Sequence, residues 1–108
     1  GLSDTIDFRV GNAMEIIPSL DMEFDLVFID ADKSNYGNYY DLIVDKVPSG
    51  GYILLDNVLW SGKVLAEVEP NDIDTKELIA LNKRLQEDDR VQNVLLPIRD
   101  GLTILRKK

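Results

Sequence analysis

The sequence predicts an open α/β sheet that is mostly parallel and ends in an antiparallel hairpin. Two nearly continuous apolar runs, residues 24–29 and 52–55, each stop at a carboxylate, which is typical of central parallel strands whose carboxyl ends meet solvent. A helical pattern separates the two runs, so a right-handed strand-helix-strand crossover is expected. An Asp-Gly pair between the last two apolar segments indicates the hairpin.

Two short elements are expected ahead of the first apolar run. Residues 6–10 alternate apolar and polar side chains and stop at Gly11, which predicts a short, half-buried strand. Residues 13–20 carry apolar side chains at helical spacing, interrupted by Pro18, which predicts a brief helix.

A longer helix is expected between the two apolar runs. Its apolar and aromatic residues recur at helical spacing and so share one face, and Pro48 with Gly50 and Gly51 stops the element. The tyrosines of this helix are interpreted as packing residues rather than as an aromatic cage. The residues on the shared face are Tyr36, Tyr40, Ile43 and Val47.

The second half of the chain supplies another helix and the hairpin. Asp74 and Glu77 stand at capping-box spacing before a run of leucines at helical spacing, which predicts a long helix. Residues 91–98 and 102–105 are strand-like and flank a turn at residues 99–101. The chain is therefore expected to end in an antiparallel pair of strands.

Composition narrows the chemistry. The 108 residues include 20 acidic and 12 basic side chains, which gives a formal charge of -8. This balance argues against a broad surface for nucleic acid or an anionic membrane and favours a small or cation-bearing partner. Because cysteine and histidine are both absent, thiolate sites, Ser-His-Asp and Cys-His nucleophiles and the usual zinc sites are excluded. Carboxylates, amides, lysines and tyrosines are left to carry the chemistry.

The same composition bears on location. No apolar run reaches about 18 residues and no basic start precedes an apolar stretch, so neither a membrane span nor a signal peptide is expected. A chain without cysteine suits a reducing compartment, so we expect a cytoplasmic protein.

The two strand ends carry candidate metal ligands. Asp30 and Asp56 each follow an apolar run, and one strand-helix-strand unit separates them, so a right-handed crossover places them on adjacent strands at the same level. Together with the carbonyl oxygen of Asn57 they form an all-oxygen set suited to Mg²⁺, Mn²⁺ or Ca²⁺. The alternative is that each Asp caps a helix or solvates a turn, and spacing alone does not decide between the two.

Three segments are distinctive in combination. They are residues 24–36 (Phe-Asp-Leu-Val-Phe-Ile-Asp-Ala-Asp-Lys-Ser-Asn-Tyr), residues 50–62 (Gly-Gly-Tyr-Ile-Leu-Leu-Asp-Asn-Val-Leu-Trp-Ser-Gly) and residues 96–103 (Leu-Pro-Ile-Arg-Asp-Gly-Leu-Thr). With these blocks the chain resembles the metal-dependent O-methyltransferases of the caffeoyl-CoA and catechol kind, which use S-adenosylmethionine. The resemblance spans nearly all of the chain and implies a Rossmann-like class I methyltransferase sheet.

The resemblance also implies roles for single residues and a reaction. A sulfonium methyl would pass in line to a phenolate or similar oxygen of a small hydroxylated, catechol-like substrate, which the cation orients and acidifies. The cation is expected to be Mg²⁺, with Ca²⁺ or Mn²⁺ as alternatives, and the intact enzyme to be a homodimer. The implied site residues are the metal ligands Asp30, Asp56 and Asn57, the candidate base Lys33, the cofactor-binding Ala13 and Asp32, and the substrate-contacting Ser61. Trp60 is a further candidate for substrate contact, because it follows the predicted metal ligands in the sequence.

Three of these roles have alternatives. Lys33 must be neutral to accept a proton, and a nearby cation lowers its pKa, but Lys33 is otherwise a solvated lysine paired with Asp32. Ser61 stands where plant members carry Asn, which leaves substrate choice open. Trp60 either walls an aromatic substrate or anchors its loop against the core.

Family members carry a helical region and two strand-helix units, with a Gly-rich cofactor loop, ahead of the part that matches. We therefore expect residues 1–108 to be the carboxyl-terminal portion of one methyltransferase domain, truncated and inactive alone. For residues 24–106 the family's sheet order implies a four-stranded sheet in the order of the Asp30 strand, the Asp56 strand, the terminal strand and the Val91 strand. The same order leaves residues 5–10 two strands away from the strand that ends at Asp30. That segment is expected to dock against the free edge of this strand, to lie loose, or to pair with another chain.

Other functions stay open at this point. A phosphoacceptor receiver domain is also a small acidic α/β module with Asp at a strand end, but it carries an early acid pair and closes with a helix. Methylation of a hydroxylated tRNA base is an alternative within methyl transfer, although the acidic balance is against it. A non-catalytic, metal-binding remnant is the third alternative.

Overall fold

The structure is a computed structural model that describes residues 1–108. Four strands form one sheet, in the order β1 (Leu26–Ile29), β2 (Tyr52–Asp56), β4 (Leu102–Lys107) and β3 (Val91–Leu96). β1 and β2 run parallel, and β4 runs antiparallel to both of its neighbours. The predicted α/β class, strand order and terminal hairpin are confirmed.

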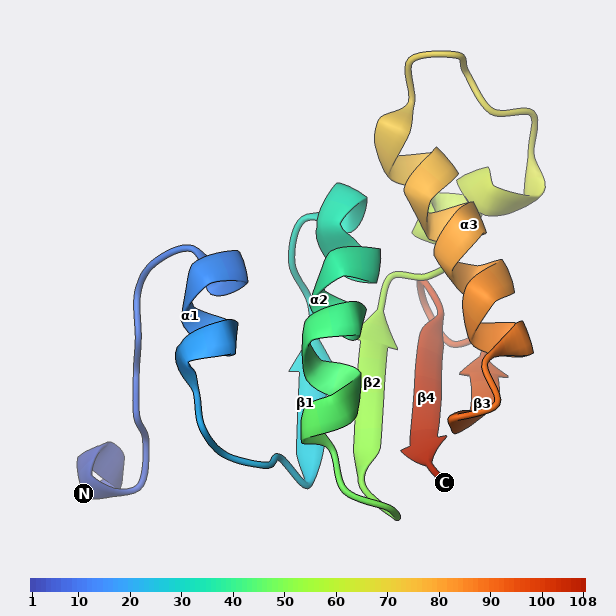
Figure 1. Cartoon of the computed structure of the whole chain (residues 1–108). Coiled ribbons are helices and arrows are strands. Elements are labelled where there is room, and N and C mark those ends of the chain that lie inside the picture. The colour runs from blue at the N-terminus through green and yellow to red at the C-terminus, as the bar shows by residue number, and fades with distance from the viewer.

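Three helices accompany the sheet: α1 (Ala13–Ser19), α2 (Tyr36–Ile43) and α3 (Ile73–Glu87). Figure 1 shows α2 and α3 on the same side of the sheet, with α1 beside α2. Short 3-10 turns, Lys33–Asn35 and Val44–Lys46, flank α2, so the single helix expected here is built from three pieces.

The core lies between the sheet and the two helices that cover it. The predicted helical face is confirmed, because all four of its residues are buried. It packs with alternate residues of the central strands and with one face of α3. The buried side chains from these three sources are Tyr36, Tyr40, Ile43 and Val47, then Ile53, Leu55 and Leu105, then Leu78, Leu81 and Leu85.

The opposite face of the sheet is apolar and uncovered. The register places Phe28, Leu54, Ile104 and Val94 in one row across the four strands. Phe28 and Val94 are each 57% exposed, and Leu26 is 62% exposed. β1 is an edge strand here, with one face and one edge that no other element covers.

The strand expected at residues 6–10 is absent. This segment has no regular structure, and Phe8 and Val10 are each 84% exposed rather than half-buried. Figure 1 shows it standing away from the sheet, and its ion pair is local, between Asp7 and Arg9. An alternating pattern forms a stable strand only beside a partner, and the chain places none next to it. Of the three expected arrangements, the structure shows the segment lying loose, without hydrogen bonds to the sheet.

The start of α3 corrects the expected capping box. Asp72, and not Asp74, is the N-cap, because its side chain accepts a hydrogen bond from the backbone N–H of Thr75 at 3.1 Å. Its other carboxylate oxygen accepts a bond from the Thr75 hydroxyl at 2.7 Å. Asp74 instead accepts a bond from the backbone N–H of Ser34, which links α3 to the turn after β1. Glu77 therefore does not close a box.

The hairpin is longer than the Asp-Gly pair indicated. β3 ends at Leu96, which pairs with Leu102, so residues 97–101 form the turn instead of the expected residues 99–101. Pro97 has no N–H to donate and stops the strand. Arg99 and Gly101 adopt positive φ values, 49° and 83°, to close the turn.

No helix of the chain combines the length and apolar character needed to cross a membrane.

Candidate functional site

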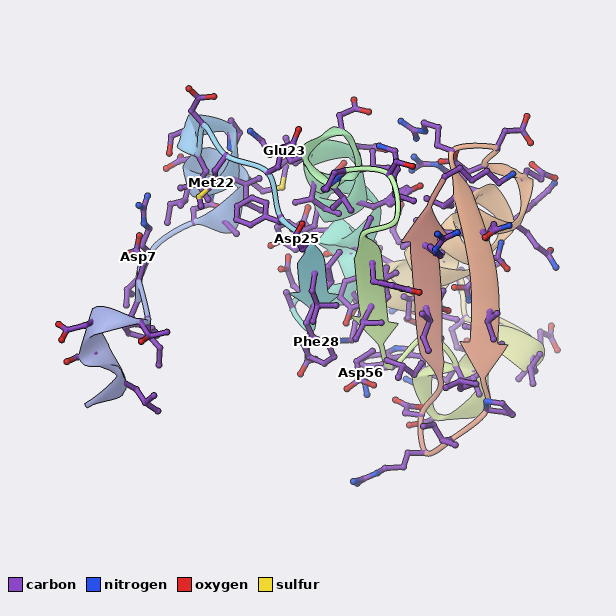
Figure 2. All side chains as sticks on the ribbon, turned by 90° about the horizontal axis from the view of Figure 1, so that it is seen from below. Asp7, Met22, Glu23, Asp25, Phe28 and Asp56 are labelled. Carbon is purple, nitrogen blue, oxygen red and sulfur yellow. The ribbon has the colours of Figure 1, made fainter.

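The carboxyl ends of β1 and β2 bring the two predicted carboxylate ligands together. Ile29 pairs with Leu55 in the parallel register, so Asp30 and Asp56 both follow a paired position. Neighbouring strands lie about 4.8 Å apart, which places the two residues side by side. Figure 2 shows Asp56 at this end of β2, close to Phe28. Asp56 and Phe28 line one depression.

The oxygen atoms of the predicted ligands are only partly engaged. Asp56 Oδ1 accepts a bond from the backbone N–H of Asn57 at 2.8 Å, and Asp30 Oδ1 lies 3.4 Å from Lys33 Nζ. The second oxygen of each carboxylate and Oδ1 of Asn57 accept no hydrogen bond within the chain. Free carboxylate and amide oxygens suit a hard divalent cation.

The set is small. No three or more His, Cys, Asp and Glu side chains gather anywhere in the chain to hold a metal ion. A cation at the strand ends would therefore rely on the carboxylates of Asp30 and Asp56, the amide of Asn57, and oxygens from water or substrate.

Lys33 is buried beside these strand ends, with 6% of its surface exposed. Its ammonium donates to the Ala31 carbonyl at 3.0 Å and to the Tyr36 hydroxyl at 2.6 Å, and it lies 3.4 Å from Asp30 Oδ1. The alternative of a solvated lysine paired with Asp32 is wrong. Burial lowers the pKa of Lys33, but the hydrogen bonds with Tyr36 and Asp30 outweigh it and hold the pKa above its ordinary value. The expected lowering by a cation stays a prediction.

Tyr36 is more than a packing residue. Its hydroxyl donates to the Asp56 carbonyl at 2.9 Å, with the Ile29 carbonyl at 3.3 Å, so one group joins the ends of β1 and β2. It also accepts the bond from Lys33. Burial raises the pKa of Tyr36, which keeps it a neutral donor. The spacing of Lys33 and Tyr36, one helical turn apart, was the available sequence signal.

The predicted cofactor residues, Ala13 and Asp32, lie beside β1 and in the segment that follows it. Asp32 accepts a bond from the Tyr39 hydroxyl at 2.5 Å, which holds the pKa of Asp32 below its ordinary value. Ala13, the first residue of α1, lines an apolar groove along β1 with Tyr39 and Asp30. The structure therefore brings Ala13 and Tyr39, the partner of Asp32, to one groove that reaches Asp30, one of the predicted metal ligands.

The predicted substrate residues follow Asn57 in the loop after β2. Trp60 is half-buried, packs against the core and lies over Lys33, with its ring centroid 5.6 Å from Nζ. It therefore anchors its loop and also borders the candidate base. Ser61 is exposed and lines an open depression with Asp56, Asn57 and two hairpin residues, Arg99 and Asp100.

The backbone around this depression is strained. The chain has four non-glycine residues with positive φ, and all four lie in the loop after β2 or in the hairpin turn that faces it. Strained residues of this kind persist where surrounding contacts hold them, and they gather at functional sites. The four are Asn57 (62°), Trp60 (49°), Ser61 (54°) and Arg99 (49°).

Comparison with known proteins gives a consistent result. A family model described as O-methyltransferase matches residues 1–108. Caffeoyl-CoA O-methyltransferase 1 of Zea mays is 40% identical over 121 residues, which covers 99% of this chain and 46% of that protein. Tricin synthase 2 of Oryza sativa subsp. japonica is 38% identical over 118 residues, which covers 99% of this chain and 40% of that protein. The chain spans less than half the length of these curated relatives.

Solved structures resemble the chain over a similar share. An SAH-bound methyltransferase from Podospora anserina matches with a TM-score of 0.79 and 34% identity, over 91% of this chain and 47% of that chain.

Proposed function

Because the chain belongs to the O-methyltransferase family, we propose that the protein transfers a methyl group from S-adenosylmethionine to a hydroxyl of a small, catechol-like acceptor, assisted by a divalent cation. Family membership bears out the resemblance seen in the sequence and the methyltransferase sheet that it implied. It leaves no support for a receiver domain. The acceptor, the cation and the role of each residue go beyond family membership and belong to the proposal.

One observation carries the metal part of the proposal. The parallel register sets Asp30 and Asp56 side by side, and each keeps one carboxylate oxygen without a partner in the chain. Asn57 adds a free amide oxygen from the next position. These three residues would hold Mg²⁺, or Mn²⁺ or Ca²⁺ in its place, and the bound cation would bring two substrate oxygens together and lower the pKa of the reacting one.

The chain's own residues supply the rest of the chemistry. Lys33 Nζ lies 3.4 Å from Asp30 Oδ1, one of the proposed metal ligands. Once the Lys33 ammonium has lost a proton, the neutral amine is the candidate base that takes the proton of the acceptor hydroxyl. Trp60 borders Lys33 and offers an aromatic wall. Ser61 lines the open depression together with Asp56 and Asn57. This arrangement favours a flat acceptor that lies across the strand ends.

The cofactor part of the proposal rests on the groove beside β1. Ala13 lines this groove with Asp30 and Tyr39, and Tyr39 fixes the Asp32 carboxylate. We propose that Ala13 contacts the adenine and that Asp32 contacts the amino acid portion of S-adenosylmethionine. The Podospora anserina relative, whose structure is SAH-bound, supports a cofactor of this type.

Two further parts of the proposal concern the assembled enzyme. Since the chain matches less than half of its curated relatives, we propose that residues 1–108 do not turn over substrate alone. We also propose that the active enzyme is a homodimer and acts in the cytoplasm.

The metal part is tested by titrating Mn²⁺ into the chain and recording the relaxation of water protons. The double variant Asp56→Ala, Asn57→Ala should lose at least tenfold in affinity, because it removes two of three ligands. Asp7→Ala, which removes a carboxylate far from the strand ends, is the matched control and should bind normally. Equal binding by the double variant and the control would overturn the assignment.

The reaction is tested by transfer of a labelled methyl group from S-adenosylmethionine to a catechol, a caffeoyl thioester or tRNA. The chain covers 46% of the Zea mays relative, so a fusion that adds the amino-terminal half of that relative would supply the part of the domain that we propose is missing. We expect methylation of the small acceptors and a loss of about 10²–10⁴-fold in turnover for Lys33→Met. Methylation of tRNA alone would replace the proposed acceptor class.

A further inference from the structure

Asp100, in the turn between β3 and β4, contacts the site through both of its carboxylate oxygens. Oδ2 accepts a hydrogen bond from Asn57 Nδ2 at 3.2 Å, and Oδ1 accepts one from the backbone N–H of Ser61. Both donors lie in the loop after β2, about forty residues earlier in the chain. The sequence assigned Asp100 only to a turn, so this long-range contact is new.

Backbone hydrogen bonds reinforce the same contact. The N–H of Leu59 donates to the Asp100 carbonyl at 2.9 Å, and the N–H of Val58 donates to the Gly101 carbonyl at 3.4 Å. A Cβ atom at Gly101 would lie 2.6 Å from Leu59 Cγ, so only glycine lets the turn approach this closely. The hairpin turn and the loop therefore form one unit, which holds the positive-φ residues of both.

The contact with Asp100 decides which end of the Asn57 amide stays free of partners within the chain. A carboxylate only accepts hydrogen bonds, so it selects the NH₂ group of the amide and turns it toward the hairpin. The carbonyl oxygen Oδ1 is then left facing away from Asp100 and free to accept. With the amide reversed, two acceptor oxygens would meet and the NH₂ group would replace the carbonyl oxygen.

We propose that Asp100 is a positioning residue that holds the Asn57 amide in the orientation required for binding a divalent cation, an inference that rests on the metal site proposed above. Asp100 acts through Asn57, because both of its oxygens are engaged with the loop. Partners of this kind, behind the direct ligands, typically change metal affinity by about 10- to 100-fold when they are removed.

The test exchanges the donor and the acceptor across the contact. In Asp100→Asn the Ser61 bond can persist, but an NH₂ group faces the Asn57 NH₂ group, so the amide of Asn57 turns over. The double variant Asn57→Asp, Asp100→Asn restores one donor opposite one acceptor and again presents an oxygen to the cation. Asp56→Ala serves as the reference for loss of a direct ligand, and far-ultraviolet circular dichroism checks the fold of each variant.

The readouts are Mn²⁺ affinity and the chemical shift of the Asn57 side-chain amide. We expect Asp100→Asn to weaken Mn²⁺ binding by about 10- to 100-fold and to move the Asn57 amide signal. The double variant should bind Mn²⁺ at least tenfold more tightly than Asp100→Asn does. Asn57→Asp alone should bind Mn²⁺ less tightly than the double variant, because its new carboxylate meets the carboxylate of Asp100.

Each outcome has one meaning. Normal Mn²⁺ binding by Asp100→Asn, together with loss of binding by Asp56→Ala, would overturn the role of Asp100 and leave the metal site standing. Normal binding by Asp56→Ala would overturn the metal site itself. A folded double variant that stays as weak as Asp100→Asn would also contradict a positioning role, because the exchange restores the pair.

Discussion

The hydroxyl of Tyr36 links the carboxyl ends of β1 and β2. Tyr36 comes from the first turn of α2, yet its Oη atom reaches the carbonyl groups of Ile29 and Asp56 and accepts a bond from Lys33. Because all of these polar groups are buried or half-buried, each would lose a hydrogen bond that water does not readily replace if the hydroxyl were absent, although Lys33 would keep its bond to the Ala31 carbonyl. The residue therefore links the packing of α2 to the geometry at the ends of β1 and β2.

Tyr36→Phe keeps the ring and removes only this link. We expect the free energy of unfolding to fall by about 1–3 kcal/mol, because buried polar groups are left unsatisfied. Urea unfolding followed by circular dichroism measures the change. Tyr52→Phe, at an exposed ring, is the matched control and should change stability by less than about 0.5 kcal/mol. A Tyr36→Phe variant as stable as this control would show that the link is not needed.

At the scale of elements, α3 is held at both ends by carboxylates. Asp72 caps its first turn through the N–H and the hydroxyl of Thr75. Asp88, just after its last turn, accepts bonds from the side chain and backbone N–H of Arg90 and from the Tyr40 hydroxyl at 2.8 Å. The helix is therefore positioned over the sheet by its caps as well as by its leucines.

The N-cap gives a direct choice between Asp72 and the capping box expected from Asp74 and Glu77. Asp72→Ala should lower the free energy of unfolding by about 0.5–2 kcal/mol, because it frees the N–H of Thr75. Glu77→Ala should have almost no effect, since Glu77 closes no box. Urea unfolding distinguishes the two, and a larger loss for Glu77→Ala than for Asp72→Ala would favour the capping box.

The other end of α3 should respond to pH. The hydrogen bonds from Arg90 hold the pKa of Asp88 far below its ordinary value of 3.8. Because the folded-state pKa is depressed, this stabilisation is complete above about pH 4 and is lost as the pH falls toward the folded-state pKa. Asp88→Asn should therefore cost about 1–3 kcal/mol at neutral pH and progressively less in acid. Asp89→Asn is the control, and a pH-independent cost for Asp88→Asn would contradict the assignment.

Local patterns predicted the buried face of α2, because it depends on the spacing of apolar residues within one element. The strand order was expected from the crossover and the hairpin together with the sheet order of the family that the chain resembles. The alternation at residues 6–10 could not reveal that no partner strand lies beside it. The choice of Asp72 over Asp74 depends on where the helical turn begins, which the leucine spacing leaves uncertain by a few residues. The contacts of Tyr36 and Asp100 with the site join separate elements, so residue spacing alone did not show them.

For the molecule as a whole, the largest departure from a closed globule is the open face of the sheet. Leu26, Phe28 and Val94 are each more than half exposed on this face, and the edge of β1 beside it is unpaired. Contiguous apolar surface of this kind binds hydrophobic dyes and promotes association of chains.

Phe28→Lys places a charge in the middle of this face. We expect weaker binding of the dye ANS and a lower apparent mass in sedimentation, with stability changed by about 0.5 kcal/mol at most, because the ring is already 57% exposed. Glu87→Lys, on the opposite side of the molecule, is the control for added charge and should leave dye binding unchanged. Equal dye binding by the two variants would show that the open face is not the apolar surface that the dye detects.

The place of β4 in the sheet has a consequence for biosynthesis. β4 is the last strand along the chain, yet it lies between β2 and β3, and the turn before it carries Asp100. A nascent chain that has not yet emerged from the ribosome beyond Leu96 therefore lacks both a central strand and the turn that holds Asn57. The carboxylates of Asp30 and Asp56 are synthesised before β4, but the site they belong to can assemble only after translation has passed β4, when the hairpin inserts beside β2.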